Sequence, residues 1–346
     1  MNPHESELAY PFGDALPASG DALEVAPGVR WLRMGLPFAL NHVNLWLVDD
    51  GDGWAVIDCG ISNDATRAAW EQAFAGALDG RPITRVIVTH CHPDHVGLAA
   101  WLCERWQVEL WMTAGEYGFA RVMSAALPGA DGASMMAHFR RHGLTDPDRL
   151  AQLEGRKQYY PSLVPQVPAA FIRLAEERPL RIGAHEWRVI SGTGHSPEHA
   201  ALYCEALDVL VSGDMLLPRI STNTSVFAIE PEADAVGQFL ASLLKFLPLP
   251  ADTLVLPSHG KPFRGMRERI AQLQAHHAER LDEVRAACAT PQSAADIVPL
   301  MFRRELDMHQ MTFAMGEALA HLHRLWFAGE LCRIAGDDGV FRFVRK

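Results

Sequence analysis

Three histidines and one aspartate stand within six residues of one another, directly after an apolar run that is typical of a buried strand. The motif Thr-His-Cys-His-Pro-Asp-His-Val-Gly follows Arg-Val-Ile-Val. Side chains alternate along an extended segment, so His90 and His92 would share one side while the cysteine between them points away. The proline would then turn the chain, which lets Asp94 and His95 face the same space. Imidazoles and a carboxylate at this density predict a metal site that suits Zn²⁺, and suits Mn²⁺ or Fe²⁺ less well.

Three further candidate ligands follow apolar runs later in the chain, each beside small or turn-forming residues. They are His195 in Gly-Thr-Gly-His-Ser, Asp214 in Ser-Gly-Asp and His259 in Pro-Ser-His-Gly. Glycine beside a ligand allows the tight turn that aims its side chain inward. A single histidine after a strand most often belongs to the core or the surface, and a single aspartate there is most often a cap or turn residue. The four motifs in this order are far more specific, and we interpret them as one metal site.

Strand-like and helical segments alternate through most of the chain, which is the pattern of layered α/β packing. We expect strands at 29–34, 41–50, 53–60, 85–90 and 108–113, a helix at 63–78, strands within 179–194, 201–214 and 253–260, and a helix at 234–246. The domain prediction is a loose N-terminal leader at 1–24, a catalytic domain at 25–265 with a helical lid or insertion at 115–177, and a C-terminal domain at 266–346. Three helices and a small hairpin in the last segment predict a mostly helical, winged-helix-like module.

Charge and composition narrow the function classes. The 346 residues carry a formal net charge of −11 and no basic run, which does not favour a nucleic-acid partner. No apolar stretch approaches the roughly 18 residues of a membrane span, and the N-terminal segment lacks the basic start and apolar core of a signal peptide. Six scattered cysteines without a Cys-x-x-Cys pair indicate reduced thiols, so we expect a cytoplasmic protein without a membrane partner.

Taken together, the motifs resemble those of the metallo-β-lactamase superfamily of hydrolases. The matching segments are Thr-His-Cys-His-Pro-Asp-His-Val-Gly at 89–97, Thr-Gly-His-Ser at 193–196, Ser-Gly-Asp at 212–214, Ser-His-Gly at 258–260 and Ile-Asp-Cys-Gly at 57–60. The resemblance spans roughly residues 25–265 and implies an α/β fold, the four-layer αββα sandwich, with two metal ions at one edge of its sheets. Aspartate rather than cysteine at position 214 resembles the hydroxyacylglutathione hydrolase branch. The tail is similar to the winged-helix-like C-terminal domain of some thioesterase-like and endoribonuclease-like members.

The resemblance also implies a role for each candidate ligand. One metal ion would be held by His90, His92 and His195, the other by Asp94, His95 and His259, with Asp214 bridging both. The cofactors would be two divalent ions, with Zn²⁺ favoured over Fe²⁺ or Mn²⁺. Two such ions lower the pKa of bound water from about 15.7 toward 7, which supplies a bridging hydroxide as the nucleophile. Asp94 would also serve as a catalytic residue that orients this hydroxide.

Residues around the metal site give weaker signals. Asp58 at the end of a strand is either an orienting partner of a histidine ligand or a simple turn carboxylate. His199, four residues after His195, is interpreted as an ordinary polar residue. Substrate contacts are expected from Arg219, Tyr159 and Tyr160. Basic residues of the insertion would suit an anionic handle such as that of CoA or glutathione, or would be solvated surface; they are Arg121, Arg140, Arg141, Arg156 and Lys157.

These features favour a dinuclear-metal-dependent hydrolase of a small-molecule acyl substrate, with a thioester preferred. A thiolate leaves without much help because the pKa of a thiol is about 8.5, and the sequence offers no obvious dedicated acid. Lactone hydrolysis uses the same nucleophile and is the first alternative. Phosphodiester cleavage, as in a nuclease, is the second, although the net charge of −11 speaks against long polyanionic substrates. A homodimer through the C-terminal module is compatible with its apolar helices.

Overall fold

Two β-sheets form the centre of the computed structural model, which describes residues 2–38, 40–155 and 158–346. The first sheet has seven strands in sequential order: β1 (Ala22–Ala26), β2 (Val29–Gly35), β3 (His42–Asp50), β4 (Gly53–Ile57), β5 (Ile83–Ile87), β6 (Leu110–Met112) and β7 (Ile172–Arg173). The second has the order β12 (Leu254–Pro257), β11 (Val209–Gly213), β10 (His199–Cys204), β9 (His185–Gly192) and β8 (Leu180–Ile182). β4 and β5 are parallel, as are β11 and β12, so their carboxyl ends lie on one side of each sheet.

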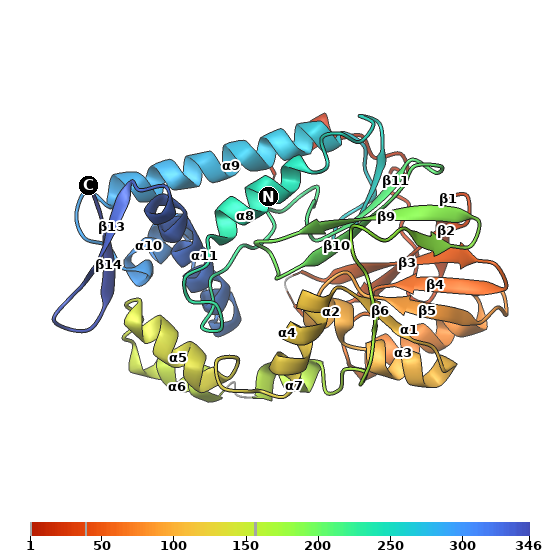
Figure 1. The fold of residues 1–346 in the computed structure, drawn as a ribbon, viewed down its shortest axis with the longest axis horizontal. Coiled ribbons are helices and arrows are strands. Elements are labelled where there is room, and N and C mark those ends of the chain that lie inside the picture. The colour runs from red at the N-terminus through yellow and green to blue at the C-terminus, as the bar shows by residue number, and fades with distance from the viewer. Residues whose placement is uncertain (1, 39, 156–157) are drawn as a thin grey trace.

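Helices cover the outer face of each sheet, which makes four layers (Figure 1). α1 (Asp64–Ala75) and α3 (Ala99–Trp106) pack on the first sheet, and α8 (Ala235–Leu244) and α9 (Met266–Ala287) pack on the second. Between the sheets, one apolar cluster joins side chains from both, including Trp31, Trp46, Ile87, Val211 and Leu256. Strands covered on both faces need apolar side chains on both, and β4 is accordingly buried at every position. The predicted αββα sandwich is confirmed.

The insertion lies between β6 and β7. It consists of α4 (Ala114–Ser124), α5 (Gly132–Arg141), α6 (Pro147–Gly155) and α7 (Tyr159–Leu163). Residues 172–173 pair with β6, so the part of the expected helical segment near residue 172 belongs to the first sheet instead. Phe139 and Leu153 of the insertion share an apolar cluster with Met311 and Leu319 of the C-terminal helices. The insertion therefore packs against the C-terminal module as well as against the sandwich.

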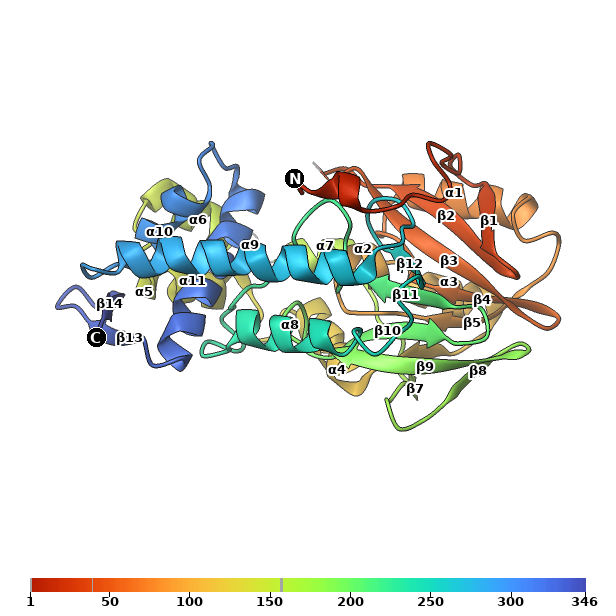
Figure 2. The same ribbon diagram turned by 90° about the horizontal axis from the view of Figure 1, so that it is seen from above.

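The C-terminal module stands at the opposite end of the molecule from the sheets, and α9 runs from one part to the other (Figure 2). It contains α10 (Ala294–Met301), α11 (Met308–Phe327) and a hairpin of β13 (Leu331–Ala335) and β14 (Phe341–Arg345). α11 is buried over most of its length, because α8, α9, α10 and the insertion surround it. This arrangement explains why the helix is apolar. Within the described residues, no helix is both long and apolar enough to cross a membrane.

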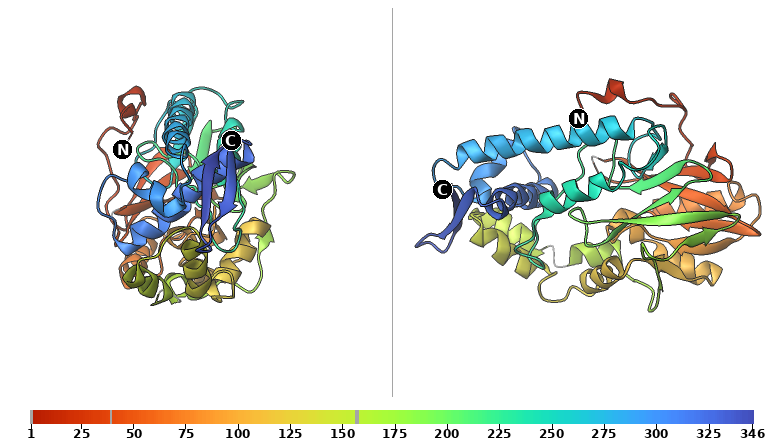
Figure 3. Two further views of the ribbon diagram at one scale, coloured as in Figure 1. Left: turned by 90° about the vertical axis from the view of Figure 1, so that its left-hand side faces the viewer. Right: turned by 45° about the horizontal axis from the view of Figure 1, so that its top comes forward.

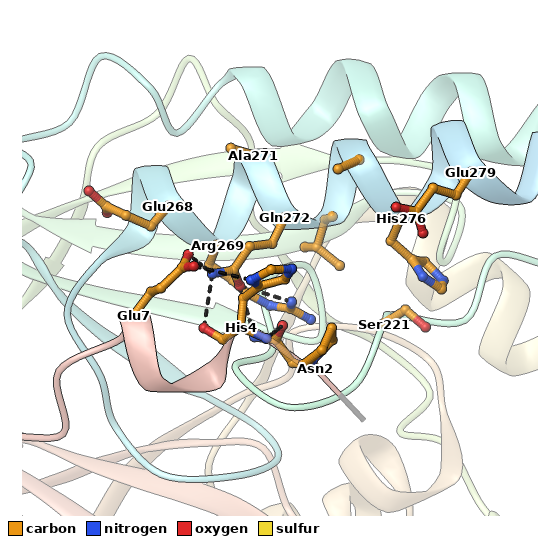
Figure 4. Close-up of a pocket in the computed structure, with 13 residues that line it drawn as sticks. Asn2, His4, Glu7, Ser221, Glu268, Arg269, Ala271, Gln272, His276 and Glu279 are labelled. Atoms are coloured by element: carbon orange, nitrogen blue, oxygen red, sulfur yellow. Dashed lines mark hydrogen bonds and ion pairs between the residues drawn. The ribbon is translucent and has the colours of Figure 1, made fainter.

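The N-terminal segment is held against α9 and the loop after β11, and the expectation of a loose leader is wrong. The backbone N–H of Asn2 donates to the carbonyl of Arg219 at 2.6 Å, and its side chain donates to Gln272 at 2.8 Å. The amide of Gln272 in turn donates to the carbonyl of His4, as Figure 4 shows. A short 3₁₀ helix at Glu5–Glu7 follows, and the segment passes along the side of the sandwich (Figure 3). Polar side chains thus fix a stretch whose composition suggests a flexible chain.

Leu8 and Leu16 provide a matched test of this attachment. The side chain of Leu8 is buried in the apolar cluster under α9, whereas Leu16 is 48% exposed. We expect Leu8→Ala to lower the free energy of unfolding by about 2–3 kcal/mol, because it removes buried methyl groups and leaves a cavity. Leu16→Ala should change it by less than about 0.5 kcal/mol. Urea denaturation of both variants measures the difference. Equal unfolding midpoints would support a loosely attached N-terminal segment instead.

Three buried histidines lie where α5 meets α11. The rings of His138 and His142 are 4.9 Å apart, and those of His142 and His323 are 6.3 Å apart. Burial lowers the pKa of His138 and His323 to about 4 and that of His142 to about 3. Arg141 and Arg333 add positive charge nearby, which lowers the pKa of His142 further. The interface between insertion and C-terminal module is therefore built around neutral imidazoles.

Acid should weaken this interface. The unfolded chain takes up protons near pH 6.5 while the folded chain does not, so stability is fully present above that pH and is lost as the pH falls toward 4. We expect His142→Leu to remove about 1 kcal/mol of the stability lost between pH 7 and pH 5.5. Thermal unfolding of wild type and variant at both pH values measures this, and identical pH slopes would contradict it.

Candidate metal centre

Residues at the carboxyl ends of four strands converge at one edge of the sandwich. His90 and His92 follow β5, and Asp94 and His95 lie just beyond them on the single-turn helix α2 (Pro93–Val96). The other three follow strands of the second sheet: His195 after β9, Asp214 after β11 and His259 after β12. The fold thus brings together all seven residues that the sequence singled out as ligands, in two groups whose candidate ligand atoms lie within 4.8 Å of one another.

The first group contains three imidazoles and one carboxylate. Nε2 of His90 lies 3.0 Å from Nδ1 of His92 and 3.2 Å from Nε2 of His195. Oδ2 of Asp214 is 3.5 Å from Nε2 of His195 and 4.0 Å from Nε2 of His90. Two nitrogens on a tetrahedral ion at 2.0–2.1 Å are about 3.3–3.4 Å apart. The spacing therefore fits ligands that share one divalent ion.

The second group contains Asp94, His95 and His259, and Asp214 reaches it with its other oxygen. Oδ2 of Asp94 lies 3.6 Å from Nε2 of His95 and 3.4 Å from Nε2 of His259. Oδ1 of Asp214 lies 3.7 Å and 3.4 Å from the same two nitrogens. One carboxylate therefore faces both groups with different oxygens, which is the geometry that a bridging ligand requires.

Hydrogen bonds to the far nitrogen fix the tautomer of three of these histidines. Nδ1 contacts an oxygen that can only accept: His95 contacts Asp58 at 2.8 Å, His195 contacts the carbonyl of Asn223 at 2.8 Å, and His259 contacts the carbonyl of His42 at 2.7 Å. In the neutral ring the proton then sits on Nδ1, which leaves the lone pair of Nε2 directed into the cluster. Such partners are typical of histidines that hold a metal ion.

Two buried atoms of the cluster test whether a cation fits. Among the described residues, Nε2 of His95 and Oδ1 of Asp214 are buried without a hydrogen-bond partner. A buried acceptor without a partner is costly, and a cation between these atoms would satisfy both. The nitrogen and oxygen donors match the preferences of Zn²⁺, Fe²⁺ or Mn²⁺. The cluster is able to bind metal ions, and its two groups are consistent with a dinuclear site.

Electrostatics differ between the two groups. Burial lowers the pKa of His92 to about 3, and repulsion from His195 adds to the effect. Burial also lowers the pKa of His90 well below its usual value, so these two imidazoles of the first group are neutral. In the second group burial opposes the charged form of His95, but Asp94, Asp58 and Asp214 together raise its pKa to about 9. The carboxylates of this group thus stabilise a positive charge close to them, which a proton or a metal ion can supply.

Asp58 contacts the candidate ligand His95, so it is more than a simple turn carboxylate. It is almost fully buried after β4 and accepts hydrogen bonds from His95 Nδ1, from the backbone N–H of Thr89 at 2.8 Å and from the Thr89 hydroxyl. Its φ of 65° lies in the left-handed region, which is strained for a residue with a side chain. The strained turn aims one carboxylate at both the strand end that carries His90 and the helix that carries His95.

His199 corrects the sequence interpretation, because it is not an ordinary polar residue. It is completely buried, and its Nε2 accepts the backbone N–H of Asp214 at 3.1 Å. A Cβ on Gly213 would lie 2.2 Å from this nitrogen, so glycine at that position is required by the close approach of the ring. His199 therefore fixes the backbone of the residue that faces both groups. Its spacing of four from His195 was the available signal.

Glu116 and Asn44 were not singled out from the sequence. Glu116 on α4 is buried and accepts hydrogen bonds from the backbone of Cys91, from Ser196 and from the backbone of Glu198, which joins the first histidine motif to the His195 loop. The side chain of Asn44 on β3 donates to the carbonyls of residues 257 and 260, on either side of His259. Neither lies in a recognisable motif, because both act on backbone groups that are distant in sequence.

The C-terminal module also reaches the metal centre. Asn223, whose carbonyl holds His195, donates from its side chain to Glu317 on α11 at 3.2 Å. The next residue toward the N-terminus, Gly316, allows the close approach, since a Cβ there would lie 2.7 Å from the hydroxyl of Ser225. A helix far beyond His195 in the sequence thereby supports the loop that orients it.

The structure places two of the three residues predicted to contact substrate beside the metal centre and the third elsewhere. Tyr159 and Tyr160 line a cavity beside His92, where Tyr160 donates to the carbonyl of Cys91 and Tyr159 contacts His309. Arg219 instead pairs with Glu5 of the N-terminal segment at 3.1 Å. It is not among the residues that line this cavity, and its substrate contact stays a prediction. Arg156 and Lys157 lie outside the described residues.

The sequence pattern of the metallo-beta-lactamase superfamily matches residues 39–259. The chain belongs to this superfamily. A second pattern, described as the metallo-beta-lactamase-like C-terminal domain, matches residues 281–346. Membership and a cluster that is able to hold metal ions make the protein a metal-dependent hydrolase. The predicted domain boundary at 265/266 stays a prediction.

Similar solved structures and related proteins support the same family assignment. A crystal structure of a beta-lactamase domain protein from Burkholderia ambifaria is 60% identical, covers 99% of both chains and has a TM-score of 0.94. A metallo-beta-lactamase family protein from Thermus thermophilus is 27% identical, with a TM-score of 0.79 over 93% of this chain and 100% of that one. The probable metallo-hydrolase YqjP of Bacillus subtilis is 24% identical over 84% of this chain and 90% of its own length. The similarity therefore includes the insertion and the C-terminal module.

Replacing one member of the first group should change the metal content. We expect His92→Ala to lose at least one of two bound metal equivalents and at least about 90% of hydrolytic activity, because the remaining donors leave that ion open to water. His185→Ala, at the start of β9 and away from the cluster, is the matched control and should retain both. Metal analysis after dialysis measures the result, and full metal content in His92→Ala would contradict the assignment.

Proposed function

We propose that the protein hydrolyses a small-molecule acyl compound, with a thioester as the preferred substrate, and that His90, His92 and His195 hold one divalent ion while Asp94, His95 and His259 hold a second. Asp214 would bridge the two ions. The observation that carries the proposal is the set of Nδ1 contacts of His95, His195 and His259, which leave Nε2 of each ring facing the cluster as the atom available to a metal ion.

When bound, the two ions would supply Lewis-acid polarisation and a water molecule of lowered pKa. The protein's own residues would orient the water and hold the histidines. Asp94 is the more accessible carboxylate, with 18% of its side chain exposed against 11% for Asp214. As a carboxylate it can accept a hydrogen bond from an attacking water and orient it, while Asp58, Asn223 and the carbonyl of His42 hold the histidines in place.

The preference for a thioester rests on where the Nδ1 protons of the fixed histidines point. The N–H groups of the three fixed histidines point away from the cluster toward oxygen acceptors. A leaving group that departs without protonation therefore suits the site, and a thiolate with a pKa of about 8.5 is such a group. An alkoxide or amide leaving group would need a proton donor.

Zinc is our proposed metal, since a set of imidazole nitrogens with carboxylates suits it best. The bridging aspartate supports a place near the hydroxyacylglutathione hydrolase branch. Three helices and a hairpin support the winged-helix likeness of the C-terminal module, but α11 is enclosed, so a role in nucleic-acid binding is not favoured. All six cysteines are free, which supports a reducing, cytoplasmic location. A homodimer stays a prediction.

A substrate panel tests the proposal. Protein loaded separately with Zn²⁺, Mn²⁺ or Fe²⁺ is assayed on acyl-CoA, acyl-glutathione, an acyl-homoserine lactone and bis(p-nitrophenyl) phosphate. We expect kcat/KM for a thioester to exceed that for the lactone by at least about tenfold, because the thiolate leaves without protonation whereas the alkoxide of the lactone does not. It should also exceed that for the phosphodiester, whose reacting centre is phosphorus rather than an acyl carbon. Faster turnover of the lactone or the phosphodiester would replace the thioesterase proposal with one of these alternatives.

A further inference from the structure

Next to the candidate metal centre lies a cavity of about 180 Å³, and His92 belongs to the walls of both. Three parts of the chain build it: the first histidine motif, the insertion and α11 of the C-terminal module. Most of its wall is apolar. Its large apolar side chains include Phe119, Met123, Met135, Phe227, Ile229 and Phe313.

The polar groups in the wall are already bound to other parts of the protein. Tyr160 donates to the carbonyl of Cys91, and the hydroxyl of Tyr159 lies 3.1 Å from Nδ1 of His309. Asp131 caps α5 by accepting from the backbone of Ser134, and the hydroxyl of Thr312 donates to the carbonyl of Met308. An apolar group that enters the cavity would therefore break no hydrogen bond of these side chains. A charged group would find no exposed hydrogen-bond partner among them.

Size limits the guest as well. Pockets for drug-sized ligands measure roughly 300–1,000 Å³. A cavity of about 180 Å³ is smaller and suits one apolar group, such as a short alkyl chain or a single aromatic ring. A nucleotide or tripeptide handle would have to remain outside it.

We propose that this cavity binds the acyl group of the substrate, and that the protein prefers carboxylic acid derivatives with a short alkyl or aromatic acyl group over acetyl derivatives. The inference rests on the proposed acyl hydrolysis. It places the scissile carbonyl near His92 and the leaving group on the opposite side, toward solvent. Phe313 and Ala130 line the cavity from α11 and from the loop before α5, so substitutions at these positions would change its size.

The anionic handle expected in the insertion stays a prediction. None of the described basic residues of the insertion lines it. Arg121 donates to the carbonyl of Pro168 and to Tyr117, so it braces the insertion itself. Among the described residues, the basic side chains of the insertion that could contact an anionic leaving group therefore lie outside the cavity.

The test uses one neutral leaving group and a series of acyl groups. N-acetylcysteamine thioesters of acetate, butyrate, hexanoate and benzoate are assayed with the metal-loaded full chain. We expect kcat/KM to rise about fourfold for each methylene that enters the cavity, which corresponds to ~0.8 kcal/mol per methylene. Benzoyl should also exceed acetyl, because its ring buries more apolar surface than a methyl group.

Three variants locate the effect. Phe313→Ala enlarges the cavity and should move the preferred chain to a longer acyl group, and Ala130→Phe fills it and should lower the hexanoyl-to-acetyl ratio at least about tenfold. Phe327→Ala removes the same side chain from the same helix at an exposed position and should leave the ratio unchanged. Thermal unfolding of each variant shows whether it is folded.

Binding of free acids separates the two proposals. By calorimetry, hexanoate should bind the wild-type protein at least about tenfold more tightly than acetate, and Ala130→Phe should abolish this preference. If thioesters are not cleaved but hexanoate binds in this way, the proposed function fails and the acyl cavity stands. If thioesters are cleaved with no dependence on chain length, or if Ala130→Phe leaves the ratio and the binding unchanged, the cavity inference is overturned.

Discussion

Two carboxylates and five imidazoles that turn acceptor atoms toward one another in a largely buried site can be stable only around positive charge. Removing such groups from water is expensive, and the expense is recovered only if a cation or a shared proton lies between them. Asp214 is decisive because each of its oxygens faces a different group. The rest of the molecule holds these seven side chains close together although their charges and lone pairs repel one another.

Two kinds of contact hold the seven side chains in place: the rigid strands that carry them, and hydrogen bonds from other residues to their rings or to the adjacent backbone. Each ligand lies at or just beyond the end of a strand covered on both faces, so the core limits where its Cα can lie. Asp58, His199, Glu116 and Asn44 then fix either the ring orientation or the adjacent backbone. Such outer contacts hold ligands within the narrow range of geometry that catalysis by metal ions requires.

The insertion and the C-terminal module add a surface that the sandwich alone does not have. They pack against each other through a continuous apolar cluster, and the cavity beside His92 lies between them. The same module supports the loop around Asn223 through Glu317. A single contact region therefore supports the loop beside the centre and shapes the neighbouring space.

The sequence by itself determined the layers, the order of the elements and the seven convergent residues, because strand ends, glycine turns and metal ligands leave local patterns. It left the role of Asp58 open and led to a wrong interpretation of His199 and of the N-terminal segment. Those features depend on contacts with backbone groups far away in sequence, which no local pattern encodes. Only the tertiary structure decided that α11 approaches the His195 loop and that an apolar cavity opens beside His92, since both arise where distant segments of the chain meet.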